Sequence, residues 1–271
     1  MPNLPCELLD HIVDLLYDGQ AFGHTPLGLE NCCLVSKSWI PRTRRHLFAK
    51  IRFRTVKSLE SWMKTFPDPS ISPACYTKLL WIGCPQAVMT EGAEAGGWIA
   101  SFSNVEHLEL GGHNVHARGW EVAFALFYGF SPVITSLRMK MVPLTFPRFF
   151  DLVLSFPLLE DLDMIDCSDV PIDDDGNSEV LSMSTAVQSS SLPMFTGSLN
   201  LYLKGGMGPI VRRLLALVDG VHFRKLSLSW TSEEDIPLTM ALMERCSRTL
   251  EYLYISCGLP GTSTRHLGPH G

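Results

Sequence analysis

From residue 76 onward, the apolar and polar positions repeat a short phrase in which one spacer separates two apolar residues. The first apolar residue of each phrase is Leu80, Leu108, Leu137, Leu162, Leu201, Leu226 or Leu253. Alternation of this kind predicts short strands whose leucines face a core. The spacings are 28, 29, 25, 39, 25 and 27 residues. All but the fourth fall within about 20–29 residues, a period typical of solenoids built from one strand and one helix per repeat.

Segments with helical periodicity lie between these phrases, at residues 120–128, 147–154, 209–218 and 238–244. Two of them open with proline, which suits the first turn of a helix. Strand and helix alternating at a fixed period predict a right-handed α/β solenoid over residues 76–258, with a parallel sheet on its concave side.

The spacers of the repeated phrase are expected to point outward from that sheet. They form a candidate substrate face, which consists of Glu109, Arg138, Asp163, Tyr202, Ser227 and Tyr254. Acidic, basic, hydroxyl and tyrosine groups are mixed along it, with no stripe of one sign. This chemistry favours a peptide or protein partner for the set, although any one spacer taken alone is more often an ordinary solvated position.

Two regions depart from the repeat. The long interval holds an acidic and serine-rich segment, so we expect an insertion that bulges out at about residues 169–195. Its Asp-x-Asp-Gly pattern does not make an EF-hand, because the first ligand position falls on Pro171. Residues 259–271 have no periodicity and are predicted to be a disordered tail.

The first 54 residues predict a separate helical domain. Asn3 and Pro5 suit a helix start, and Leu8, Ile12 and Leu15 follow at helical spacing. Two further short helices are expected over the next thirty residues. So wide an apolar face on so short a helix needs a neighbour on more than one side. Residues 55–75 predict a linker helix that ends at two prolines.

Four pieces of this N-terminal region occur in the order and spacing of an F-box: Leu4-Pro5-x-Glu7-Leu8, Ile12 with Leu15, Cys32-x-Leu34-Val35-Ser36-Lys37-x-Trp39, and Leu47-Phe48. The chain therefore resembles fungal F-box proteins with a leucine-rich-repeat-like C-terminal solenoid. The resemblance implies a short all-helical F-box, followed by the α/β solenoid. It also implies that a Skp-type adaptor, and through it a cullin, binds Leu4, Pro5, Glu7, Leu8, Ile12, Leu15, Leu34, Val35 and Trp39. On pattern alone, a helical cap on the domain behind them is the favoured interpretation, and the ordered set of four pieces favours the F-box.

Composition and charge narrow the class of protein further. A net charge of −6 weighs against nucleic-acid binding by phosphate neutralisation. No secretory signal and no apolar run of about 18 residues is visible, so we expect no membrane partner. The eight cysteines have no zinc-site spacing and read as reduced thiols. The expected location is the cytoplasm, the nucleus or both.

No catalytic constellation emerges from the sequence, and we expect neither an enzyme nor a bound cofactor or metal. Gly129-Phe-Ser131-Pro-Val133 lacks the final glycine of a nucleophile elbow. The glycines around Met207 do not form a phosphate-binding loop. His107, His113 and His116 lie close together, but no carboxylate or thiol completes a metal site.

Together with the solenoid pattern, the F-box resemblance implies the substrate-receptor subunit of an SCF-type cullin–RING ubiquitin ligase. The alternative is a free-standing leucine-rich-repeat interaction scaffold that is not coupled to ubiquitination. The two hypotheses share the solenoid and differ only in what the N-terminal helices bind. A third and weaker hypothesis is a hydrolase with an unrecognised nucleophile, which a reactive-serine or reactive-cysteine probe would expose.

Overall fold

The structure is a computed structural model of the full chain. It describes residues 5–18, 27–83, 98–112, 120, 124, 126–128, 130–144, 146–169, 195–203, 206–217, 221–230 and 233–257. Leu4, most of the predicted insertion and the predicted tail therefore lie outside the described residues.

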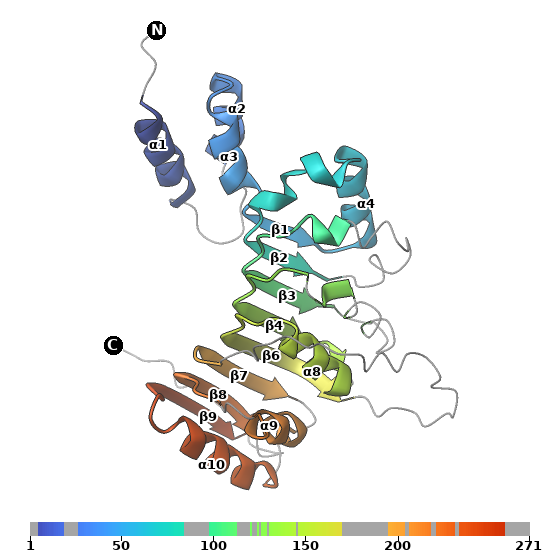
Figure 1. Ribbon diagram of the computed structural model, residues 1–271, viewed down its shortest axis with the longest axis vertical. Coiled ribbons are helices and arrows are strands. Elements are labelled where there is room, and N and C mark those ends of the chain that lie inside the picture. Colours follow the sequence, from blue (N-terminus) through green and yellow to red (C-terminus); the bar gives the residue numbers. More distant parts are fainter. Residues whose placement is uncertain are drawn as a thin grey trace, which may run out of the picture.

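Three short helices form the N-terminal end: α1 (Cys6–Asp18), α2 (Leu27–Val35) and α3 (Ile40–Leu47). Figure 1 shows them beyond the first strand of the sheet, at the top of the molecule. Polar contacts tie α3 to α1, because Arg42 pairs with Asp10 and His46 lies 2.8 Å from Asp14. The rings of Tyr17 and His46 also contact each other in a tilted arrangement, with centroids 4.8 Å apart.

A single parallel sheet follows the helices, with its strands placed in the order of the sequence (Figure 1). Its strands are β1 (Lys50–Phe53), β2 (Leu79–Ile82), β3 (His107–Gly111), β4 (Ser136–Lys140), β6 (Asp161–Asp169), β7 (Ser198–Leu203), β8 (Lys225–Trp230) and β9 (Tyr252–Cys257). A short strand, β5 (Pro143–Leu144), pairs with the end of β6. The predicted mixed α/β class with a parallel sheet is confirmed.

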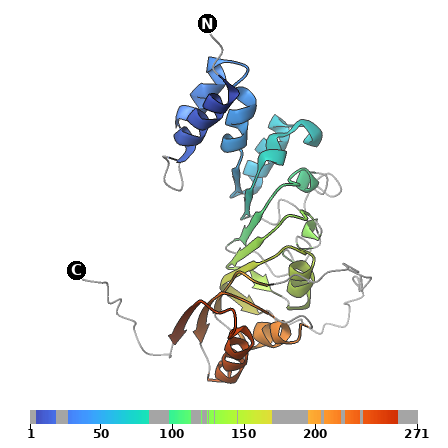
Figure 2. The same ribbon diagram turned by 60° about the vertical axis from the view of Figure 1, so that its left-hand side comes forward.

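Helices cover one side of this sheet. They are α4 (Val56–Thr65), α8 (Phe146–Leu154), α9 (Gly208–Leu215) and α10 (Asp235–Cys246), with 3₁₀ turns at Pro69–Ile71 and Pro73–Tyr76. Figure 2 shows that the helices lie on the outer side of a curved sheet. The predicted helix at 120–128 falls partly outside the described residues. The other side of the strands, which we call the open face, is where the predicted spacers point.

The core lies between the sheet and these helices. Two rows of apolar side chains run across all eight strands of the main order, one residue from each strand. We call the first the anchor row; its members are Ile51, Leu80, Leu108, Leu137, Leu162, Leu199, Leu226 and Leu253. Every member is buried except Leu253, which is 44% exposed. The last strand is therefore not covered as the others are.

The register corrects two sequence predictions. The anchor on β7 is Leu199 and not Leu201, because Leu199 pairs with Leu162 and Leu226. A strand also occurs at the end of residues 1–54, for which the sequence predicted a domain of short helices: β1 pairs with β2, and Ile51 lies beside Leu80. Buried Ile51 and Phe53 alternate with exposed basic residues, as a half-buried strand requires.

Candidate functional site

The first candidate surface lies on α1, which is apolar on two sides. Leu9 and Val13 form its buried side. Leu8, Ile12 and Leu15 lie at positions i, i+4 and i+7, so they share one face of the helix, and all three are exposed. Part of the apolar face of α1 therefore remains open to solvent.

Helix α2 ends with two further exposed apolar side chains. Leu34 is 84% exposed and Val35 is 66% exposed, whereas Leu29 and Cys32 of the same helix are buried. Together with the exposed side of α1 they form what we call the N-terminal apolar surface: Leu8, Ile12, Leu15, Leu16, Leu34 and Val35. Single exposed apolar residues are common, but a concentration of six in two helices that contact each other is typical of an interaction site.

The predicted adaptor-binding residues fall mainly on this surface. Pro5 and Glu7 are exposed at the start of α1, and Leu4 lies outside the described residues. Trp39 differs from the rest because it is half-buried, and its carbonyl oxygen accepts hydrogen bonds from the backbone N–H and the hydroxyl of Thr43, both at 2.9 Å. Leu16 was not predicted as a site residue, although its spacing from Ile12 places it beside the same face.

The second candidate surface is the open face of the sheet. One row of side chains crosses its middle, and we call it the central row: Arg52, Trp81, Glu109, Arg138, Asp163, Asn200, Ser227 and Tyr254. The predicted substrate face coincides with this row except at one position. Because the anchor of β7 is Leu199, Asn200 occupies the row, and Tyr202 lies on the same face two residues further along.

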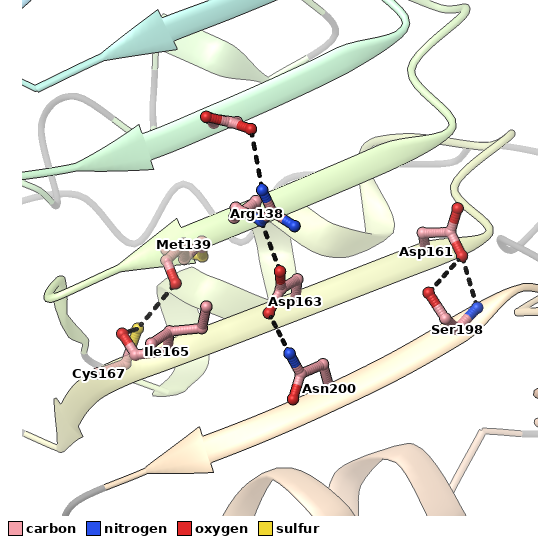
Figure 3. A network of polar contacts seen from close by, with 9 residues as sticks. Arg138, Met139, Asp161, Asp163, Ile165, Cys167, Ser198 and Asn200 are labelled. Atoms are coloured by element: carbon pink, nitrogen blue, oxygen red, sulfur yellow. Dashed lines mark hydrogen bonds and ion pairs between the residues drawn. The ribbon is translucent and has the colours of Figure 1, made fainter. Parts of the chain in front are cut away.

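A ladder of polar contacts joins four strands within the central row (Figure 3). Arg138 Nε lies 2.5 Å from Asp163 Oδ2, and Arg138 Nη1 lies 3.2 Å from Glu109 Oε1. Asn200 then donates to the other oxygen of Asp163 at 2.9 Å. Partial burial lowers the pKa of the Arg138 guanidinium, but the hydrogen bonds and charges of Asp163 and Glu109 outweigh it, so the net pKa is raised. The ladder therefore holds one cation between two carboxylates.

A second contact ties β6 to β7 at the start of both strands (Figure 3). Asp161 Oδ1 accepts hydrogen bonds from the backbone N–H and the hydroxyl of Ser198, at 2.5 Å and 2.7 Å. Gly197 makes the approach possible, because a Cβ there would lie 2.3 Å from the same oxygen. These two strands flank the longest interval in the repeat, so the contact fixes their register across it.

Tyrosines dominate the C-terminal end of the open face. Tyr202 on β7 and both Tyr252 and Tyr254 on β9 are more than half exposed. Between them, β8 contributes only the small side chains of Ser227 and Ser229 at the facing positions. Tyrosine offers a large contact area at a small cost in side-chain entropy, which suits a protein interface. The sequence prediction did not include Tyr252, Asn200, Trp81 or Arg52 in this face.

Ser131, the serine of the incomplete nucleophile-elbow pattern, has a structural role. Ser131 is fully buried, and its hydroxyl lies 3.0 Å from the carbonyl oxygens of Ser103 and Val105 in the preceding repeat. Within the described residues, no group of three or more His, Cys, Asp or Glu side chains is placed to hold a metal ion. His107 is exposed on β3, and His113 and His116 lie outside the described residues. No helix in the described part has the length and apolar character needed to cross a membrane.

In sequence comparison, neither a protein-family model nor a curated protein matches the chain.

Proposed function

We propose that the chain is a substrate receptor of an SCF-type ubiquitin ligase, which binds a Skp-type adaptor through α1–α3 and a protein substrate through the open face. The observation that carries this proposal is the N-terminal apolar surface. Five of its members, Leu8, Ile12, Leu15, Leu34 and Val35, are residues that the F-box resemblance assigned to the adaptor interface from sequence alone.

Physical argument supports a permanent partner at this surface. Burying apolar surface contributes about 25 cal/mol per Å², so two helices that leave six large apolar side chains in water forgo several kcal/mol. A partner that covers them recovers this free energy on binding. The Arg42–Asp10 ion pair and the contact of His46 with Asp14 already hold α1 against α3, so the surface is formed before a partner binds.

The open face supports the second half of the proposal. It is concave, carries no helix among the described residues, and offers charged, amide and tyrosine groups along one row (Figure 2). Repeat proteins use such extended concave faces to bind other proteins. Adaptor and substrate would then occupy two separate surfaces of one chain, as a bridging subunit requires.

The test is co-expression with a Skp-type adaptor, followed by size-exclusion chromatography. We expect a one-to-one complex that the Leu8→Asp, Leu34→Asp double variant loses. The matched control is the Ile71→Asp, Leu158→Asp double variant, because these two side chains, like Leu8 and Leu34, are at least half exposed but lie outside α1–α3. It should retain the complex.

Two results contradict the proposal. One is a folded, monodisperse chain that forms no complex with the adaptor, which favours the free-standing scaffold. The other is loss of the complex by both double variants to the same extent, which shows that added charge and not the N-terminal apolar surface is responsible.

A further inference from the structure

Strand β1 presents a row of cations to the open face. Lys50, Arg52 and Arg54, which follows the strand directly, are exposed and alternate with buried Ile51 and Phe53. We call these three residues the basic strip. The whole chain has a net charge of −6, so the strip is opposite in sign to the molecule that carries it.

The charges of Arg52 and Arg54 are not neutralised by a neighbouring carboxylate among the described residues. In the described part of the chain, Arg52 and Arg54 take part in no ion pair, and Lys50 lies over the ring of Tyr17 at 5.6 Å. The first carboxylate along the central row is Glu109, two strands from Arg52, and Arg138 already engages it. The two arginines therefore keep their full charge for a ligand.

An aromatic side chain lies next to the strip. Trp81 is the register partner of Arg52 and is half-exposed on the same face. Its ring lies across Gly83, where a Cβ would be 2.3 Å from the ring. The glycine thus lets the indole lie along the sheet. A flat aromatic side chain beside two free guanidinium groups suits a peptide that carries both negative charge and an apolar side chain.

Edge protection is a different reason for placing basic residues on an outer strand, since charges discourage strands of two molecules from pairing. The opposite end of this sheet does not follow that rule. There β9 presents Tyr252, Leu253 and Tyr254 to solvent and no charge at these positions. Binding of a ligand therefore explains the cations of β1 better than edge protection does.

We propose that the basic strip, with Trp81 beside it, binds an acidic stretch of the protein substrate, whose negative charge comes from carboxylate or phosphate groups. This inference rests on the proposed role as a substrate receptor and assigns the chemistry of the substrate. Arginine forks pair with both kinds of anion, so the strip itself does not separate the two sources.

The test is fluorescence polarisation with labelled probe peptides and the full chain, alone or in its adaptor complex. The probes contain a central tryptophan flanked by glutamates, by phosphoserines or by lysines. We expect the glutamate or phosphoserine probe to bind, more weakly as salt rises, and the lysine probe not to bind. The stronger of the two anionic probes identifies the source of the charge.

The decisive variant is Arg52→Glu, Arg54→Glu, which we expect to weaken binding of the anionic probe by about tenfold or more. Lys57→Glu, Lys64→Glu makes the same change in net charge on exposed positions of α4, on the helical side of the sheet, and should stay within about twofold of the parent. The Arg52→Gln, Arg54→Gln variant removes both charges without adding new ones, so it is less disruptive to folding, and its affinity for the anionic probe should fall by an intermediate factor.

Equal losses in the two charge-reversed variants, or no binding of either anionic probe at low salt, overturn the proposal. Adaptor binding measured on the same preparations separates this failure from that of the proposed function. If the chain binds the adaptor but no anionic probe, the proposed role of the basic strip is disproved and the proposed receptor function is not. A chain that binds the probe through Arg52 and Arg54 but no adaptor leaves the strip as an acidic-peptide site outside a ligase.

Discussion

Replacement of Arg138 by leucine tests whether the ladder of the central row stabilises the sheet. The change removes the one cation between Glu109 and Asp163, whose side chains are only 20% and 15% exposed. Both carboxylates lose a charge-assisted hydrogen bond and remain in place. The expected effect is a loss of folding stability without a change of fold.

The magnitude follows from burial and spacing. Hydrogen bonds to charged groups contribute about 1.5–3 kcal/mol when buried, and exposed ion pairs about 0.2–1 kcal/mol. Arg138 is 51% exposed, so the two contacts together are worth an intermediate value of about 1–2 kcal/mol. Repulsion between two carboxylates on strands roughly 10 Å apart adds about 0.5–1 kcal/mol in a largely aqueous setting. We therefore expect about 2 kcal/mol in total.

The assay is urea unfolding at neutral pH, followed by circular dichroism. The control is Arg224→Leu, because Arg224 and Glu251 are 4.0 Å apart and both are well exposed, so its loss should change stability by less than about 0.5 kcal/mol. The Arg138→Leu, Asp163→Asn double variant should be less destabilised than the two single variants added together. Additive effects, or an Arg138→Leu variant as stable as the Arg224→Leu control, would refute the reasoning.

Three further predictions concern stability. Leu162→Ala should lower the free energy of unfolding in urea by about 3–5 kcal/mol because the side chain is fully buried, whereas Leu253→Ala in the same row should lower it by less than half as much. Equal losses would contradict the conclusion that β9 is less well covered than the inner strands. Asp235 is buried and accepts a hydrogen bond from the backbone N–H of Met207, so Asp235→Ala should lower stability by about 1–3 kcal/mol in thermal unfolding, and no change would contradict its role before α9. Burial raises the pKa of the Cys167 thiol to about 11, from 9.0, so the unfolded chain releases this proton first. Stability due to this thiol is complete below pH 9 and falls by about 2–3 kcal/mol as pH rises to 11, a loss that Cys167→Ala should lack when urea midpoints are compared at both pH values.

The sequence predicted the strands well because each carries a strict alternation of apolar and polar residues. It misplaced the anchor of β7, since Leu199, Leu201 and Leu203 all fit that alternation and the long interval removes the usual spacing. Only pairing with Leu162 decides among them. The strand β1 was missed because four residues, two of them basic, give too short a pattern to separate from the helix before it.

The candidate sites were also predicted in part from the sequence and missed in part. The spacing of Leu8, Ile12 and Leu15 on one helix face was visible in the sequence. Which side of α1 stays open was not, because that depends on Leu9 and Val13 packing inward. The basic strip escaped sequence analysis for the same reason as β1: its residues form a row only once the strand is recognised. Contacts between strands, such as that of Arg138 with Asp163, depend on register and not on local pattern.

Because the strands follow one another in chain order, each inner strand of the main order pairs, among the described residues, with the strands before and after it. Free energy in such an array is close to a sum of local terms, so parts of it open without the whole. The outermost strand β9 has one strand neighbour within the described residues and an anchor leucine that is partly in water. Opening should begin there, with amide hydrogens exchanging sooner in β9 than in β4 or β6. Tyr252 and Tyr254 thus lie on the strand that opens first, where a bound partner would do most to slow hydrogen exchange.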